Sequence, residues 1–476
     1  MSSSGGAGLV RVLGRWDVLA VAFGAMIGFG WIVLTGGFLE DAGTLGAALA
    51  FVIGGIIVSL VGLTYAELVS AMPEAGGEHN YVLRGLGSWP AFLTSWTLVL
   101  GYVAVCAFEA VALPHSLKYL VPQLDTGYLW TIADYDVYAV WAAVGIGGGL
   151  AMAILNYVGV RPAAIFQSIA VVFLIAVGAT LLVGSFTGGD PGNMQPLFAT
   201  GFSGILVVLI AVPFLFVGFD IIPQSAGEIR LPYKMIGILL IISVALAAAW
   251  YILIILTVGS SLPADQLAGA DLAAADGMSA LWNSQTMGNI LVLGGIAGIL
   301  TSWNGFLIGG SRLIYAMAES GMLPRWFAKV HPRFHTPSNA IIFITALTVI
   351  APLFGRQTLI WLVGAGGFAI VVAYIMVAIT FLVLRRREPG MERPFRVGPA
   401  RTVGVLAVVL AIGLLVLFLP GMPGGLSVPE WIVLAIWGVL GLVLLTRVPR
   451  ITHGPDAEER IRAATNRQHH ASTIKS

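Results

Sequence analysis

Long runs of apolar residues recur along almost the whole chain and predict its architecture. Each run is close to the roughly 20 residues that a helix needs to cross about 30 Å of hydrocarbon. Strands of membrane β-barrels are short and alternate between apolar and polar positions, so the pattern predicts an all-α integral membrane protein. Twelve spans are expected, at residues 18–39, 43–71, 91–113, 138–158, 163–183, 202–225, 235–258, 288–317, 339–354, 359–384, 404–419 and 431–445.

The composition agrees with a chain that lies mostly in lipid. Of 476 residues, 58% are hydrophobic and only 10% are charged, against about 25% charged residues in soluble domains. The single cysteine, Cys106, lies inside an apolar run, and the histidines lack a ligand pattern with cysteine or carboxylate. No nucleophile has an evident base nearby. We therefore expect no metal, no cofactor, no catalytic group and no nucleic-acid partner.

The basic residues predict the orientation of the chain. Cytoplasmic connections of membrane proteins carry an excess of Lys and Arg. With an even number of spans both termini share one side, and placing them in the cytoplasm leaves only Lys118 and Arg356 outside. The residues placed inside are Arg11, Arg15, Arg84, Arg161, Arg230, Lys234, Arg325, Lys329, Arg333, Arg385, Arg386, Arg387, Arg393, Arg396, Arg401, Arg447 and Arg450. A multi-pass protein of the cell membrane with cytoplasmic termini is expected.

Two spans carry helix-breaking residues near their middles. The first contains Gly-Ala-Met-Ile-Gly-Phe-Gly-Trp at 24–31, and the sixth contains Pro213, the sequence Gly-Phe-Asp at 218–220, and Pro223. Glycine costs about 1 kcal/mol and proline about 3 kcal/mol inside a helix. Released backbone groups are tolerated in a membrane only where they line a cavity or bind a ligand. Matched interruptions predict an inverted repeat of five plus five helices with a substrate site between the halves; the alternative is that the small residues only permit close helix packing.

These segments also resemble the amino acid, polyamine and organocation transporter superfamily. The similar stretches are 24–30, 65–68, 72–77, 218–220, 226–228 and 311–324, and the resemblance covers about residues 15–400. It implies a leucine-transporter-type fold and alternating access. On this interpretation residues 1–400 form the core, with repeats at about 18–185 and 202–385; residues 401–446 add helices 11 and 12, and 447–476 form a cytoplasmic polar tail.

The resemblance places the substrate at the two breaks, and the backbone chemistry agrees. Amides from Gly28 to Gly30 begin a half-helix, whose partial positive charge can hold a carboxylate. Carbonyls that end the half-helix before Val217 and Gly218 can accept from an ammonium group, so a zwitterion fits. The remaining wall is expected from Met26, Phe29, Phe214, Phe216, Trp303, Asn304 and Phe306, although ordinary core packing is the alternative for each aromatic residue.

Two carboxyl groups at membrane depth are candidates for ion coupling, since such groups are costly there. Asp220 lies just past the sixth-helix break, where it could take up and release a proton. Its alternative role is to hydrogen-bond the loosened backbone. Glu109, near the outer end of the third span, is a candidate for coupling, gating or structural support.

The coupling ion is expected to be a proton rather than sodium. Some similar transporters have a lysine in the fifth helix, beyond a glutamine like Gln167, but this chain has Phe-Leu-Ile at 173–175. A lysine mechanism is therefore doubtful. Sodium would require Thr301 and Ser302 to join first-helix carbonyls as ligands, and hydroxyls in membrane helices usually bond their own backbone.

The sequence thus predicts a permease, not an enzyme, that moves small neutral amino acids by proton coupling or exchange. Two alternatives stay open. One is an amine or polyamine carrier in which Asp220 neutralises the substrate ammonium. The other is a membrane sensor that binds its ligand without moving it.

Overall fold

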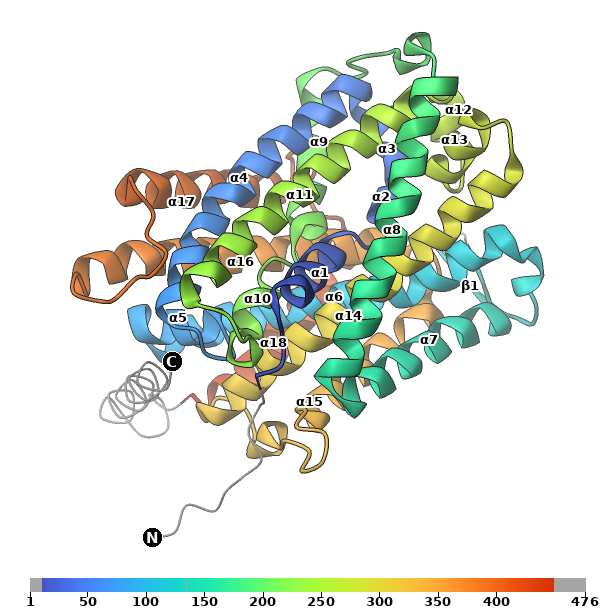
Figure 1. Cartoon of the computed structure of the whole chain (residues 1–476). Coiled ribbons are helices and arrows are strands. Elements are labelled where there is room, and N and C mark those ends of the chain that lie inside the picture. The colour runs from blue at the N-terminus through green and yellow to red at the C-terminus, as the bar shows by residue number, and fades with distance from the viewer. Residues whose placement is uncertain (1–10, 134, 449–476) are drawn as a thin grey trace.

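The computed structural model describes residues 11–133 and 135–448 and is almost entirely helical (Figure 1). Among these residues, eleven helical segments are long and apolar enough to cross a membrane. The all-α membrane fold is therefore confirmed. The uninterrupted spans are α4 (Thr44–Ala71), α6 (Ser88–Leu120), α7 (Ala139–Val158), α8 (Val160–Gly188), α11 (Tyr233–Gly259), α14 (Gln285–Glu319), α16 (Thr358–Arg387), α17 (Ala400–Leu417) and α18 (Val428–Leu445).

The ninth predicted span, 339–354, is a shorter apolar segment. It consists of α15 (Ser338–Thr348), eleven residues long, and a 3-10 turn at Ala351–Phe354. Pro352 lies in that turn, where its missing amide hydrogen costs no helical hydrogen bond. The apolar run is present as predicted, but only part of it is an α-helix.

Both spans that carry the helix-breaking residues are interrupted. The first is divided into α1 (Arg15–Met26), α2 (Gly30–Val33) and α3 (Thr35–Ala42), and the sixth into α9 (Phe202–Phe216) and α10 (Ile221–Gln224). Gly218 has φ +131°, a backbone conformation that favours glycine. Residues 27–29 and 217–220 thus stand between helical pieces, as the sequence predicts.

The two interruptions lie against each other in the middle of the protein. A Cβ atom on Gly218 would lie only 2.9 Å from the Met26 amide nitrogen and 3.0 Å from the Ala25 Cβ atom. Glycine therefore permits the close approach of the two breaks. Around them, α1 packs against α8, α11 and α14, while α4 runs beside α11 (Figure 1).

Short helices and a strand hairpin lie in the connections between spans. Helix α5 (Glu78–Leu86) is amphipathic and joins α4 to α6. Strands β1 (Tyr128–Ile132) and β2 (Tyr135–Tyr138) form an antiparallel hairpin in which Trp130 pairs with Val137. Helices α12 (Ala264–Ala268) and α13 (Ala273–Leu281) follow α11.

Buried ion pairs join helices at the end of the molecule that carries α5, called here the arginine-rich face. Arg312 and Glu228 form a two-pronged pair at 3.0 and 3.1 Å, and each side chain is 1% exposed. Glu67, equally buried, pairs with Arg393 at 3.0 Å and also with Arg385. Removing one partner of such a pair costs about 3–5 kcal/mol, because it leaves the other charge buried without compensation.

Candidate functional site

The first helix break is occupied by a carboxyl group from α6. Glu109 is buried, and its carboxyl group lies beside the Phe29 backbone N–H and the Ser302 hydroxyl, while its Oε2 atom has no hydrogen-bond partner in the described structure. A Cβ atom on Gly28 would lie 2.1 Å from Glu109 Oε1 and 2.9 Å from Ser302 Oγ. The missing side chain of Gly28 therefore makes a cradle that holds a carboxyl group against the start of α2. We call Gly28, Phe29 and Ser302 the carboxyl cradle.

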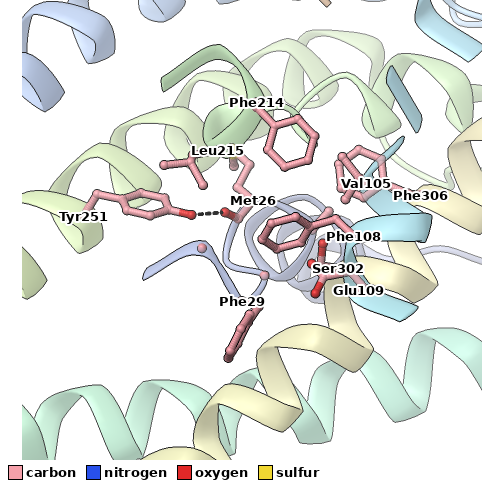
Figure 2. Close-up of a pocket in the computed structure, with 13 residues that line it drawn as sticks. Met26, Phe29, Val105, Phe108, Glu109, Phe214, Leu215, Tyr251, Ser302 and Phe306 are labelled. Atoms are coloured by element: carbon pink, nitrogen blue, oxygen red, sulfur yellow. Dashed lines mark hydrogen bonds between the residues drawn. The ribbon is translucent and has the colours of Figure 1, made fainter. Parts of the chain in front are cut away.

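A small pocket lies beside this cradle, between the two breaks (Figure 2). Its free volume is about 10 Å³, which is room for no more than one water molecule. In this arrangement the pocket is closed, and helices must move before a small organic molecule can enter. The lining residues are Ala25, Met26, Gly28, Phe29, Gly30, Val105, Phe108, Glu109, Phe214, Leu215, Tyr251, Ser302 and Phe306.

The wall of the pocket is mainly aromatic and aliphatic. Phe108 meets Phe214 edge to face, with ring centroids 5.5 Å apart. Tyr251 approaches from α11, and its hydroxyl donates a hydrogen bond of 3.0 Å to the Met26 carbonyl at the end of α1 (Figure 2). Glu109 is the one carboxyl group in this lining. The pocket therefore suits an apolar group beside a carboxylate.

Six of the predicted substrate residues line the pocket together with the predicted coupling residue Glu109. They are Met26, Gly28, Phe29, Gly30, Phe214 and Phe306. The Phe29 ring points away from Phe214 and Phe306 (Figure 2) and meets His115 edge to face at 6.1 Å.

The other predicted substrate residues lie outside the lining. Phe216 stacks against Tyr251 and Phe51. Val217 and Gly218 form part of the non-helical backbone of the second break.

Trp303 and Asn304 lie on the other side of α14. The Trp303 ring lies beside Gly148 and Gly149 of α7. The Asn304 amide donates to Gln167 at 2.7 Å and accepts from Asn156 at 2.9 Å. Their surroundings are those of residues that join helices.

Asp220 lies next to the second break, outside the lining of the pocket. It is fully buried, and Gly218 N–H donates to its Oδ1 atom at 2.7 Å. The Tyr102 hydroxyl donates to Oδ2, also at 2.7 Å. Asp220 therefore holds the loosened backbone and at the same time faces a polar side chain of α6.

Neutral donors occupy the carbonyl oxygens that a sodium ion would need near α1. The Thr301 hydroxyl donates to the carbonyls of Gly24 at 3.1 Å and Gly298 at 2.9 Å. The Gln167 amide donates to the carbonyls of Ala20 at 3.2 Å and Thr301 at 3.1 Å. These hydrogen bonds join α1, α8 and α14.

Several lining residues escaped the sequence analysis. Val105 and Phe108 precede Glu109 by four and one positions on α6, so Val105 and Glu109 share a helix face. A tyrosine hydroxyl inside an apolar run also needs a partner, which marks Tyr251. Ala25 and Leu215 carry no such signal, because only the rotation of their helices turns them toward the pocket. Ser302 was considered in the sequence only as a sodium ligand.

Comparison with known proteins identifies relatives over nearly the full length. A family model described as amino acid permease matches residues 13–444. A methylthioribose transporter of Bacillus subtilis is 27% identical over 92% of this chain and 93% of its own length. The branched-chain amino acid permease BcaP of the same organism is 27% identical, over 93% and 94%. Its aspartate-proton symporter is 26% identical, over 84% and 78%.

Proposed function

The chain belongs to the amino acid permease family, and we propose that it moves small neutral amino acids across the cell membrane by alternating access. The carboxyl cradle is the observation that carries this proposal. The cradle accommodates the carboxyl group of Glu109, so it has the shape and the donors that a substrate carboxylate requires. In the proposed cycle the substrate carboxylate replaces Glu109 there.

The second break supplies the groups for an ammonium. Gly218 N–H would continue α9 by donating to the Phe214 carbonyl, but it donates to Asp220 instead. The carbonyl end of α9 is thereby left without its next helical partner, and it carries partial negative charge. A zwitterion can therefore lie between the two breaks, with its carboxylate at Gly28 and its ammonium at the end of α9.

The pocket wall favours a neutral substrate side chain. Val105, Phe108, Leu215 and Phe306 present hydrocarbon, and the lining contains no lysine or arginine. The relative that is named as a branched-chain permease agrees with this preference. We propose aliphatic and small neutral amino acids as the substrate class.

We further propose that a proton drives uptake, with Asp220 and Glu109 as the coupling carboxyl groups. In the described residues neither has a cation within ion-pair distance, and a buried carboxylate without a partner is costly. Displacement of Glu109 by the substrate would favour protonation of its side chain. A relative named as an aspartate-proton symporter supports this choice. The basic residues support a cytoplasmic arginine-rich face.

Uptake into proteoliposomes tests the proposal. Purified protein should accumulate a labelled neutral amino acid when the vesicle interior is alkaline, and the accumulation should stop when a protonophore collapses the gradient. Sodium gradients should have no effect. Binding of the amino acid without any uptake would instead indicate a sensor and would refute the transport function.

An amine or polyamine carrier is a second candidate because of Glu109. If this carboxyl group stays in the pocket, it can pair with an ammonium group, and the substrate needs no carboxylate of its own. Competition separates the two cases. Neutral amino acids should compete for uptake under the main proposal, whereas amines that lack a carboxylate should compete under the second.

A further inference from the structure

A second group of polar side chains lies buried toward the arginine-rich face, between α4, α5, α10 and α16. Glu78, the first residue of α5, is fully buried and accepts a hydrogen bond from the Gln224 amide. Its Oε1 atom has no hydrogen-bond partner in the described structure. The hydroxyls of Tyr65, Tyr81 and Tyr374 are likewise buried and unpartnered there. Polar atoms in such numbers need water or a mobile proton to satisfy them.

Glu78 differs from the other buried glutamates of this face in its partners. Glu228 pairs with Arg312, and Glu67 pairs with two arginines. Within the described residues no Lys, Arg or His lies within ion-pair distance of Glu78. Its charge is therefore uncompensated when the group ionises, which is the condition under which a buried carboxyl keeps its proton.

Helix α10 joins Glu78 to Asp220. Gln224, which holds the Glu78 carboxyl, is one turn beyond Asp220 and donates its backbone N–H to the Asp220 carbonyl at 3.2 Å. Burial raises the pKa of Glu78 well above its usual range, and the negative charge of Asp220 raises it further. Tyr65 and Tyr374 also lie close enough to interact electrostatically with the carboxyl groups of both Glu78 and Asp220.

We propose that Glu78 is a proton carrier, which passes the coupling proton between Asp220 and the arginine-rich face. This inference rests on the proposed role of Asp220 in coupling. The Tyr65 hydroxyl is the relay, because it lies near the Glu78 carboxyl group and has no hydrogen-bond partner in the described structure. It is therefore free to bond either the carboxyl group or a water molecule. Its ring packs against Phe219, directly before Asp220, at 5.3 Å.

The route continues from Glu78 to the surface. Tyr81 lies close enough to interact electrostatically with the carboxyl groups of both Glu78 and Glu74. Glu74 is half-buried and also has an unpartnered oxygen. Burial raises the pKa of Glu74 to about 7, against the opposing effect of Arg84. This carboxyl group can therefore exchange protons with solvent near neutral pH.

The transfer conserves protons and charge. Asp220 gives up its proton and becomes a carboxylate, while the Glu78 carboxylate becomes the acid. A hydroxyl or a water molecule between them accepts one proton and donates another. The pair carries one proton and one negative charge before and after the step, which avoids two buried carboxylates at once.

The variant Glu78→Gln tests the proposal in proteoliposomes. The amide keeps an oxygen that can accept from Gln224, but it cannot release a proton. Uptake driven by a proton gradient should be lost, whereas counterflow of labelled for unlabelled substrate should persist, because counterflow does not require the empty carrier to return. Glu78→Asp, which restores an acid, should recover part of the driven uptake.

A matched control is Glu319→Gln. Glu319 also accepts a hydrogen bond from a tyrosine, Tyr315, but it lies exposed at the end of α14. This variant should transport like the wild type. If Glu78→Gln retains driven uptake with the pH profile of the wild type, the proposal is wrong. Should Glu78→Gln fail to fold, Tyr65→Phe provides a second test, because it keeps the ring and removes the relay hydroxyl. Proton-driven uptake by this variant should be slower than that of the wild type.

Infrared titration separates this inference from the transport proposal, because it needs no substrate. Solubilised wild-type protein should show a protonated carboxyl band near neutral pH, and Glu78→Gln and Asp220→Asn should each change its titration. Glu319→Gln should not. Wild-type protein without driven uptake would refute the transport proposal, and this titration would still decide whether Glu78 carries a proton. A titration unaltered by Glu78→Gln would overturn the inference.

Discussion

Replacing Gly28 with alanine should disable the carboxyl cradle while leaving the fold intact. The new Cβ atom would lie 2.1 Å from Glu109 Oε1. An ordinary van der Waals contact begins at 3.4 Å, so the carboxyl group must retreat by about 1.3 Å, the difference between these two distances. A substrate carboxylate that takes the place of Glu109 meets the same obstruction.

The loss of affinity follows from the two donors of the cradle. The Phe29 N–H and the Ser302 hydroxyl lie beside the Glu109 carboxyl group. Under the proposed function both donate to the substrate carboxylate, and a hydrogen bond to a charged group contributes about 1.5–3 kcal/mol. Withdrawal of the carboxylate from both donors costs at least about 3 kcal/mol. Since about 1.4 kcal/mol corresponds to a tenfold change in affinity, the dissociation constant should rise at least about 100-fold.

Gly37 provides the control for this measurement. It lies in α3 of the same span, and a Cβ atom there would meet nothing within 4 Å. Binding of a transported amino acid by purified Gly28→Ala and Gly37→Ala proteins can be compared by calorimetry, after gel filtration shows that both are folded. Gly37→Ala should bind like the wild type. Wild-type affinity in folded Gly28→Ala would show that the carboxylate binds elsewhere.

Three further predictions address coupling, orientation and pH. Asp220→Asn cannot change its charge, so proton-driven accumulation should fail while binding and counterflow survive; intact accumulation would exclude Asp220 as the coupling group. A cysteine that replaces the exposed Asp271 should react with an impermeant thiol reagent from outside intact cells, whereas one that replaces Arg386 should not, and the reverse result would invert the orientation. Burial raises the pKa of Glu74 from 4.5 to about 7. Its contribution to the free energy of unfolding is therefore fully present below about pH 4.5, where the group is protonated, and is lost as the pH rises through about 7. Glu74→Gln should therefore flatten the fall in melting temperature between about pH 5 and pH 8, and an unchanged slope would contradict this origin.

The fold could be predicted largely from hydropathy, because the requirement to satisfy every backbone group in lipid leaves helices as the only solution for long apolar runs. The exception is informative. Residues 339–354 are apolar throughout most of their length, yet α15 ends at Thr348 and a 3-10 turn with Pro352 follows. Hydropathy measures transfer of side chains into lipid and carries no information on where a helix unwinds inside protein.

The lining of the candidate pocket could be predicted only in part, since glycine and proline mark a broken backbone but not the rotation of neighbouring helices. On α14, Ser302 and Phe306 are four residues apart and both line the pocket. Trp303 and Asn304, between them in sequence, face α7 and α8. Apolar residues surround α14 on most sides, so no amphipathic pattern indicates the facing side.

The two helix breaks share a feature that, under the proposed function, would connect substrate binding to proton movement. A carboxyl group of the chain itself lies at each break: Glu109 lies beside the first, and Asp220 accepts from the backbone of the second. Under the proposal, a substrate carboxylate that enters the carboxyl cradle would displace Glu109 within a pocket lined by Phe108 and Phe214, where a charged carboxylate is costly. Uptake of a proton by Glu109 removes that cost. Binding of an amino acid would then favour protonation of Glu109, and no lysine in the fifth span would be needed. Binding of an amine substrate would not favour protonation, because it leaves Glu109 ionised as its partner.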